Sequence, residues 1–213
     1  MIAARYRYVA IEGPIAAGKT SLAKRLAERF NADLLLEDPA SNPFLPGFYA
    51  DMRRNALATQ LFFFLQRSKQ LAEFKLPDAG ERPVVADFIL EKDPLFAHFT
   101  LDGHELRLYD DIYARLRMSP PAPDLVIYLQ ASVETLVERL NRRGHRDERN
   151  VSERYLSDLA DRYTRFFHSY QAAPLLIINS DHLNFVDRPA DFELLVERIH
   201  AMRGTREYFN RAG

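Results

Sequence analysis

A short stretch near the beginning of the sequence, GPIAAGKTS, has the residues of a phosphate-binding loop. It satisfies the pattern GxxxxGKT without a gap, and it lies between an apolar run and a helical pattern, which is the context that this motif requires. In such a loop the backbone N–H groups and the lysine bind the phosphates of a nucleoside triphosphate, and the final hydroxyl binds Mg²⁺. The residues predicted to hold ATP are Gly13, Ala16, Ala17, Gly18, Lys19, Thr20 and Ser21.

A second stretch, VVADFILEKDP from Val84 to Pro94, contains two aspartates. Asp87 ends an apolar run, which we expect to be a buried strand beside the strand that leads into the phosphate-binding loop. Asp87 and Thr20 would then be placed to hold Mg²⁺ together. Asp93 follows six residues later, and its role depends on which molecule accepts the phosphate.

Several arginines gather in the stretch RLNRRGHRDER, where a predicted helix ends. Phosphoryl transfer spreads negative charge over the oxygens of the transferred group, and arginines on a closing segment can stabilise that charge. Arg139 and Arg143 share a helical face, so we expect both to contact the phosphates. A solvated basic helix end, favoured by the helix dipole, is the alternative explanation for any single arginine. The predicted lid spans about residues 139–150 and carries Arg139, Arg142, Arg143, Arg146 and Arg149.

Short apolar strands that alternate with helical patterns must position these residues. Strands are predicted at residues 6–11, 33–37, 83–87, 125–130 and 173–179. Helices are predicted at residues 21–30, at 48–74 with an interruption near Arg54 and Asn55, and at about 90–98, 105–117, 131–143, 152–171 and 189–202. The alternation predicts an α/β fold of the P-loop NTPase type, a five-stranded parallel sheet with helices on both faces. We expect one domain over residues 1–213, with a polar C-terminal tail at about 204–213.

The composition argues against several kinds of function. The chain has 29 basic and 30 acidic residues and a formal net charge of −1, so its overall charge gives no reason to expect binding to nucleic acid or to an anionic membrane. It has no cysteine, which excludes disulfides, zinc-thiolate sites and thiol nucleophiles. Neither a signal peptide nor a membrane-spanning run is recognisable, and a cytoplasmic protein is predicted.

A phosphate-binding loop does not identify the phosphate acceptor, so three classes of protein are considered: a small-molecule kinase, a regulatory GTPase, and a mechanical or signalling ATPase. A GTPase is disfavoured because no DxxG follows the third predicted strand and no NKxD motif occurs. An ATPase module usually needs partner surfaces or arginines from another subunit. A single sequence does not show such partners, so this alternative stays open. The small size and the arginine cluster favour a small-molecule kinase.

Further residues at characteristic spacings indicate one family of such kinases. Glu37 ends the second predicted strand, in the sequence EDP with NPFL close behind, and Glu148 lies in the arginine-rich segment before the YL of the next helix. From Val9 to about Tyr163 the sequence resembles the deoxyribonucleoside kinase family, specifically its bacterial members that act on deoxyadenosine, deoxyguanosine or deoxycytidine. The resemblance depends on the phosphate-binding loop and on Glu37, Tyr49, Gln60, Arg67, Asp87, Asp93 and Glu148.

The resemblance implies roles for three of these residues at the sugar of the acceptor. Glu37 would accept the proton of the 5′-hydroxyl as that hydroxyl attacks the γ-phosphate of ATP. Tyr49 and Glu148 would hold the 3′-hydroxyl, and a tyrosine in this place would crowd a 2′-hydroxyl. The resemblance therefore favours a deoxyribose acceptor.

Other residues are implied to contact bases. Gln60 and Arg67 are seven residues apart on one face of a predicted helix, where an amide and a guanidinium can pair with a base edge while Asp93 orients the guanidinium. Family members that prefer thymidine lack this arginine–aspartate pair, so adenine, guanine or cytosine is favoured. Phe96 is a candidate to stack on the acceptor base, and the loop containing Asn184 and Phe185 is a candidate to contact the donor base.

The sequence departs from the family pattern at Phe88, where the family commonly has an arginine that helps to hold the 5′-oxygen and the transferred phosphate. Phenylalanine cannot supply that charge. Either Lys92 or a lid arginine replaces it, or turnover is low, or the substrate lies differently.

The sequence thus predicts a kinase of nucleotide salvage that transfers the γ-phosphate of ATP to the 5′-hydroxyl of a deoxynucleoside; a homodimer is implied by the resemblance alone. One alternative is a nucleoside monophosphate kinase, in which Arg53, Arg54 and Arg67 would bind the acceptor phosphate, or another small-molecule kinase with a P-loop. The other is an ATP-binding regulatory module without acceptor turnover. The preferred base and the choice between ATP and GTP are left open.

Overall fold

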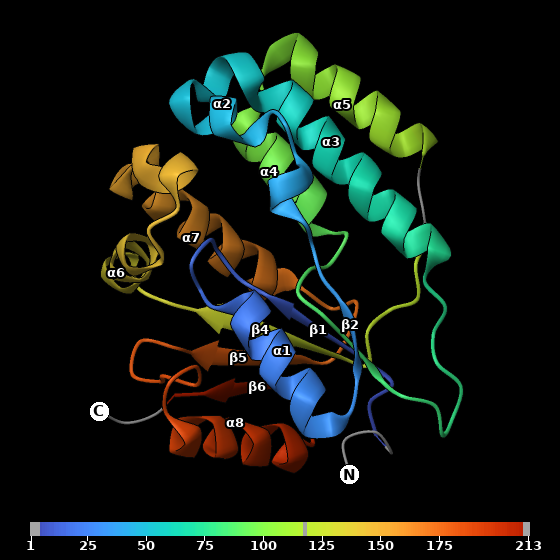
Figure 1. Cartoon of the computed structure of the whole chain (residues 1–213). Helices are drawn as coiled ribbons and strands as arrows, with labels where there is room; N and C mark the ends of the chain where they lie inside the picture. The colour runs from blue at the N-terminus through green and yellow to red at the C-terminus, as the bar shows by residue number, and fades with distance from the viewer. Residues whose placement is uncertain (1–4, 117–118, 211–213) are drawn as a thin grey trace.

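A parallel β-sheet forms the centre of the structure, a computed structural model that describes residues 5–116 and 119–210 (Figure 1). Within these residues the sheet has six strands in the order β2-β3-β1-β4-β5-β6, and each neighbouring pair is parallel. The strands are β1 (Tyr8–Glu12), β2 (Asp33–Leu35), β3 (Val84–Ala86), β4 (Leu125–Gln130), β5 (Leu175–Asn179) and β6 (Arg206–Phe209). The predicted α/β fold with a parallel sheet is confirmed.

The helices agree closely with the sequence pattern. The α-helices are α1 (Lys19–Phe30), α2 (Leu45–Ala50), α3 (Met52–Glu73), α4 (Lys92–Thr100), α5 (Gly103–Arg115), α6 (Val133–Arg143), α7 (Glu153–Ser169) and α8 (Pro189–Ala201), with short 3-10 helices η2 (Pro39–Ser41) and η3 (Arg146–Asn150). The predicted interruption near Arg54 and Asn55 lies instead at Asp51, whose side chain accepts a hydrogen bond from the backbone N–H of Arg54 at 3.2 Å and so caps α3.

The prediction of five strands and a polar C-terminal tail is wrong in one respect, because Arg206–Phe209 forms β6. This strand pairs only with β5 and lies at the edge of the sheet, so its residues do not need the continuous apolar character of a central strand. Hydrogen bonds from a side chain of β6 also hold this strand in place. Arg206 donates to the carbonyl oxygens of Phe167 at 2.7 Å and Tyr170 at 2.5 Å.

Helices cover both faces of the sheet (Figure 1). Successive residues of β1 point to opposite faces. Val9 lies with Leu26 of α1 and Ile199 of α8 around one small cavity. On the other face Tyr128 of β4 stacks on Phe167 of α7, with ring centroids 4.3 Å apart. The central strands are therefore buried on both sides, which explains their all-apolar sequences.

A second group of helices lies beyond the carboxyl ends of β1, β2 and β3. Helix α3 packs on α2, α4 and α5, while α4 also contacts α7 and α2 contacts η3 (Figure 1). The carboxyl ends of these parallel strands open toward this group, and strand order reverses at β1, the position where open α/β sheets bind ligands. In the part of the chain that is described, no helix is both long and apolar enough to cross a membrane.

Candidate active site

The phosphate-binding loop joins β1 to α1 in a conformation that two glycines permit. A Cβ on Gly13 would lie 2.6 Å from the carbonyl oxygen of Leu129, so no larger residue fits against β4 there. Gly18 has a φ of +97°, in the left-handed region that favours glycine, and α1 begins at the next residue. The N-terminus of α1 is thereby directed at the space where phosphates would bind.

Lys19 lies across this loop. Its Nζ donates hydrogen bonds to the carbonyl oxygens of Gly13 at 2.8 Å and Pro14 at 3.1 Å. Burial lowers the pKa of Lys19 and the nearby carboxylate of Glu12 opposes that effect. The two carbonyl dipoles compensate the positive charge of this buried ammonium only in part, and an anionic ligand would compensate the rest.

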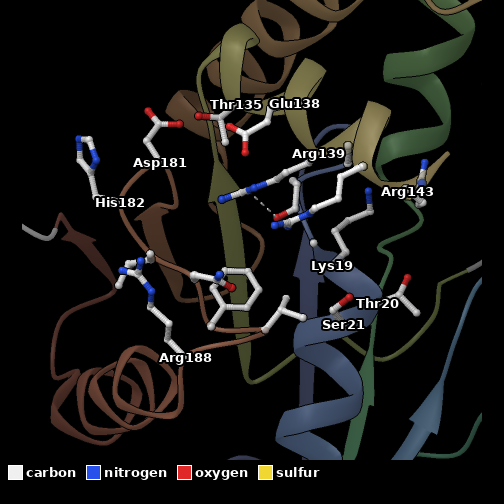
Figure 2. A pocket seen from close by; sticks show the side chains of 18 residues that line it. Lys19, Thr20, Ser21, Thr135, Glu138, Arg139, Arg143, Asp181, His182 and Arg188 are labelled. Carbon is white, nitrogen blue, oxygen red and sulfur yellow. Dashed lines mark hydrogen bonds between the residues drawn. The ribbon is translucent and has the colours of Figure 1, made fainter. Parts of the chain in front are cut away.

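A cavity of about 730 Å³ opens beside the loop, between α6 and the segment 181–188 (Figure 2). Figure 2 shows Arg139 of α6 and Lys19 on one side of this cavity, with Asp181 and Arg188 of the segment 181–188 on the other. Arg139 donates to Ser180 Oγ at 3.0 Å and to the carbonyl oxygen of Ser180 at 2.6 Å, which anchors it to the end of β5. The other residues that line this donor cavity include Ala16, Ala17, Gly18, Thr20, Ser21, Arg142, Arg143, Asn184 and Phe185.

Thr20, at the start of α1, and Asp87, just after β3, are in direct contact. Thr20 Oγ1 donates to Asp87 Oδ2 at 2.5 Å, and Asp87 Oδ1 accepts the backbone N–H of Glu37 at 2.8 Å. Among the described residues no group of three or more His, Cys, Asp and Glu side chains could hold a metal ion. Mg²⁺ does not need one, since it keeps several waters and usually takes one or two protein ligands with the phosphates of its substrate. A hydroxyl and a carboxylate in contact therefore fit Mg²⁺.

A second cavity, of about 160 Å³, adjoins the first. Ala16, Lys19, Thr20 and Arg143 line both cavities, so the two meet at the phosphate-binding loop. The remaining residues of this acceptor cavity include Glu37, Tyr49, Thr59, Gln60, Phe63, Arg67, Asp87, Lys92, Phe96, Glu148, Tyr155 and Tyr163. The sequence-predicted substrate residues thus converge from α2, α3, η3 and the loop after β2; Asp93 alone does not line the cavity and reaches it through Arg67.

Arg67, a buried residue of α3, connects two carboxylates. Its Nε donates to Glu37 Oε1 at 2.6 Å, and its Nη1 forms an ion pair with Asp93 Oδ1. Burial lowers the pKa of Arg67, but Asp93 and Glu37 more than offset this and hold it above its usual range. Burial raises the pKa of Asp93, and Arg67 offsets only part of that increase.

Glu37 is held by a second cation. Its Oε2 accepts a hydrogen bond from Lys92 Nζ at 3.1 Å, while its Oε1 is bound by Arg67. Burial raises the pKa of Glu37, but Arg67, Lys92 and Lys19 together lower it to about 2. Glu37 is therefore a carboxylate at every physiological pH.

Two lid residues are also paired with each other. Arg143 Nε donates to Glu148 Oε2 at 2.9 Å, and the side chain of Glu148 is 14% exposed. The pair closes one side of the acceptor cavity, and η3 contacts α2, the helix that carries Tyr49. The side chain of Arg146, another member of the predicted cluster, lies outside the described part of the structure.

Comparison with known proteins gives the same picture as the geometry. Residues 9–202 match the family model of deoxynucleoside kinases. The chain belongs to the deoxynucleoside kinase family. The resemblance inferred from the sequence is confirmed, and since members of the family are phosphotransferases, the chain is an enzyme that uses a nucleotide phosphate donor.

Relatives within the family cover nearly the whole chain. It is 34% identical to a deoxyguanosine kinase of Bacillus subtilis, over 90% of this chain and 95% of the relative. It is 30% identical to a deoxyadenosine kinase of Lactobacillus acidophilus, over 92% of this chain and 96% of the relative. The solved structure of deoxyadenosine kinase from M. mycoides with bound dATP is similar with a TM-score of 0.78 at 24% identity, over 91% of this chain and all of that one. That structural likeness supports the fold.

Some residues of the site were not singled out from the sequence. Glu12, the last residue of β1, is completely buried, and its Oε1 accepts hydrogen bonds from the N–H of Gly13 at 3.0 Å and from Tyr163 Oη at 2.9 Å. The signal was available, because Glu12 ends an apolar strand just as Asp87 does. Thr59 and Tyr155 had no such signal, since they belong to helical patterns that any packed helix would show.

Phe88, the departure from the family pattern, lines neither cavity. Its side chain is 0% exposed and belongs to the hydrophobic core. Lys92, four residues later and the first residue of α4, lines the acceptor cavity, and its Nζ lies 5.9 Å from the centroid of the Phe88 ring. The position of Phe88 is thus an apolar support beneath a cation.

Proposed function

We propose that this member of the deoxynucleoside kinase family transfers the γ-phosphate of ATP to the 5′-hydroxyl of deoxyadenosine, deoxyguanosine or deoxycytidine. The observation that carries the proposal is that two cavities, one at the phosphate-binding loop and one lined by Glu37, share Lys19 and Thr20 on their common wall. A triphosphate in the first and a nucleoside in the second would bring the γ-phosphate and a hydroxyl together.

The chemistry requires one bond to form and one to break. The acceptor oxygen bonds to the γ-phosphorus, the bond from that phosphorus to the β,γ-bridging oxygen breaks, ADP leaves, and the hydroxyl proton passes to Glu37. A carboxylate with a pKa near 2 is a weak base, so it takes the proton as the new bond forms and the hydroxyl becomes acidic. Glu37 also orients the hydroxyl, which is the larger part of catalysis in this class of reaction.

The charges around the transferred group follow from the same geometry. Lys19 would contact the outer phosphates, and Thr20 with Asp87 would hold Mg²⁺, which when bound neutralises charge on the β- and γ-phosphate oxygens. Arg139 and Arg143 line the donor cavity and would stabilise the transferred group from the lid side. Arg143 would have to loosen its pair with Glu148 to do so.

Recognition of the acceptor is assigned to the residues around the second cavity. Gln60 and Arg67 would pair with the base edge while Asp93 holds the guanidinium in place. Tyr49 and Glu148 would hold the 3′-hydroxyl. The two relatives named above are a deoxyguanosine kinase and a deoxyadenosine kinase, which supports a purine deoxynucleoside as the first acceptor to test.

A nucleoside monophosphate acceptor would require guanidinium groups available for its phosphate. Arg67 is already bound to two carboxylates. Arg53 is an exposed residue paired with Asp102 at 3.6 Å, and neither Arg53 nor Arg54 is among the residues that line the acceptor cavity. The described geometry therefore favours the nucleoside over the monophosphate.

An assay that couples ADP release to a spectroscopic signal tests the proposal directly. We expect turnover with ATP and deoxyadenosine, deoxyguanosine or deoxycytidine, weaker turnover with thymidine, and none with the corresponding monophosphates. Phosphorylation of a monophosphate and of no nucleoside would reject the proposal in favour of a monophosphate kinase. Stable ATP binding without any acceptor-dependent turnover would favour a regulatory module.

Two further statements about the protein stay predictions from the sequence, the homodimer and the cytoplasmic location. Sedimentation equilibrium of the purified chain measures the first, with a mass of twice 24.7 kDa expected. Fluorescence microscopy or fractionation of the source cells measures the second.

A further inference from the structure

Lys92 is a charged residue in an unusual place. It is the first residue of α4, is only 3% exposed, and lines the acceptor cavity. Lysine is almost never fully buried unless it is paired. Its Nζ lies 3.1 Å from Glu37 Oε2 and 3.9 Å from Glu12 Oε2, so it is held between two carboxylates.

The other cations that line the acceptor cavity have different positions or partners. Among the described residues that line it, Lys19 lies on the phosphate-binding loop, Arg67 is bound by Glu37 and Asp93, and Arg143 is paired with Glu148. Arg67 holds one oxygen of Glu37 and Lys92 holds the other. A hydroxyl that approaches Glu37 at Oε2 therefore meets the ammonium of Lys92.

Glu12 gives Lys92 a second, fixed partner. Its carboxylate accepts hydrogen bonds from the N–H groups of Gly13 at 3.0 Å and Ile89 at 3.2 Å, and from Tyr163 Oη at 2.9 Å. The Phe88 ring lies beneath the ammonium and offers only a weak cation–π contact. When an acceptor hydroxyl takes one oxygen of Glu37, Lys92 can turn toward that hydroxyl without losing its pairing with Glu12.

We propose that Lys92 is a catalytic residue whose ammonium contacts the acceptor oxygen and the γ-phosphate while that group is transferred. The proposal rests on the proposed function. As the acceptor oxygen bonds to the γ-phosphorus, the bond to the β,γ-bridging oxygen breaks, the hydroxyl proton passes to Glu37 and ADP leaves. Lys92 keeps its own protons throughout, and its charge stabilises the oxygens on which negative charge gathers. It thus supplies a cation that the side chain at Phe88 cannot.

Kinetics of Lys92→Gln test this role, because glutamine removes the positive charge but keeps a polar side chain that can donate a hydrogen bond. We expect kcat to fall about 10²–10³-fold, with the KM values of ATP and of the best wild-type deoxynucleoside changed less than about threefold. Lys92→Arg, which restores the charge, should recover most of the lost kcat. Lys69→Gln, the same change at an exposed position of α3, is the control and should behave as wild type. Lys92→Met carries the same expectation and takes the place of Lys92→Gln if that variant does not fold.

A mimic of the transition state separates catalysis from packing. In the complex of ADP, aluminium fluoride and the same deoxynucleoside, the fluoride group stands for the transferred phosphate. We expect Lys92→Gln to bind this complex about 100-fold more weakly than wild type, while ATP alone and the nucleoside alone bind as before. A Lys92→Gln variant with wild-type kcat, or one that weakens the ground-state ligands and the mimic equally, would overturn the assignment. A wild-type chain that phosphorylates no deoxynucleoside would instead overturn the proposed function, and the assignment with it.

Discussion

The ion pairs of Arg67 give a quantitative test of how the acceptor side is built. Arg67 is 4% exposed and binds Glu37 and Asp93, while Asp93 Oδ2 has no hydrogen-bond partner among the described residues. Arg67→Met would remove the guanidinium and leave Asp93 buried without its cation. Removing one partner of a buried ion pair typically costs about 3–5 kcal/mol, and we expect a loss of this size in the free energy of unfolding.

The companion changes separate the charge from the packing. Asp93→Asn leaves Arg67 bound to Glu37, so its expected cost is about 1.5–3 kcal/mol, that of one hydrogen bond to a charged group. The double variant Arg67→Met with Asp93→Asn buries neither charge, and Glu37 retains Lys92. Its cost is therefore expected to be smaller than the sum of the two single costs by roughly 0.5–3 kcal/mol, the range found for residues in contact.

Urea unfolding of the three variants and the wild type, followed by circular dichroism, measures these differences. Arg53→Met is the control, because Arg53 and Asp102 form an ion pair at 3.6 Å with side chains 89% and 80% exposed. That pair should contribute less than about 1 kcal/mol. Single costs that simply add in the double variant would refute the reasoning, since they would mean that Arg67 and Asp93 do not interact energetically.

The Arg67→Met variant also tests how the enzyme selects the nucleobase of its acceptor. If Arg67 pairs with the base edge, Arg67→Met should lower kcat/KM for deoxyadenosine or deoxycytidine more than for thymidine. A site built to pair with a polar edge loses discrimination when its donor is removed. An equal loss for every base would assign Arg67 to the support of Glu37 instead.

Three other changes test further parts of the site. Glu37→Gln is expected to lower kcat about 10²–10⁴-fold while ATP affinity, measured by calorimetry, is retained; an unimpaired kcat would exclude Glu37 as the base. Gly18→Ala places a Cβ 3.1 Å from the Phe185 ring at a φ of +97°, so urea unfolding should show a loss of about 1–3 kcal/mol, and wild-type stability would contradict that strain. The N–H of Gly204 holds the pKa of Glu207 below its usual range, so Glu207 stabilises the fold at neutral pH and ceases to do so as the pH falls through that lowered value. The melting temperatures of wild type and Glu207→Gln should accordingly differ at pH 7 and converge in acid; a constant difference would exclude this carboxylate as the cause.

Local patterns were sufficient to predict the elements that bear the site. The central strands β1, β3 and β4 are buried on both faces, so their sequences are continuous apolar runs that stand out from the helices. The phosphate-binding loop is equally local, because its glycines, lysine and threonine are consecutive in the chain. Asp87 could be placed next to Thr20 because carboxyl ends of adjacent parallel strands meet at one edge of a sheet.

Contacts between distant segments could not be predicted in the same way. The partners of Lys92 are Glu12 of β1 and Glu37 of the loop after β2, which are 80 and 55 residues away in the sequence. No local sequence pattern predicts contacts at such separations. The edge strand β6 has a polar sequence because only one neighbour holds it. The burial of Phe88 likewise has no local signal: Phe88 lies between β3 and α4 and packs into the core, while Lys92, four residues later, lines the cavity.

The placement of Glu37 between two cations explains how its carboxylate stays ionised and correctly oriented before substrates bind. Arg67 and Lys92 each hold one carboxylate oxygen, which keeps Glu37 charged and fixes its direction. Both cations also have a second carboxylate, Asp93 for Arg67 and Glu12 for Lys92. An acceptor can therefore displace either cation from Glu37 without leaving that cation buried and unpaired, which is the costly outcome. The edge of the nucleobase would contact Arg67 and the acceptor hydroxyl would contact Lys92. Binding of the correct nucleoside would therefore also release the carboxylate of Glu37 for proton transfer.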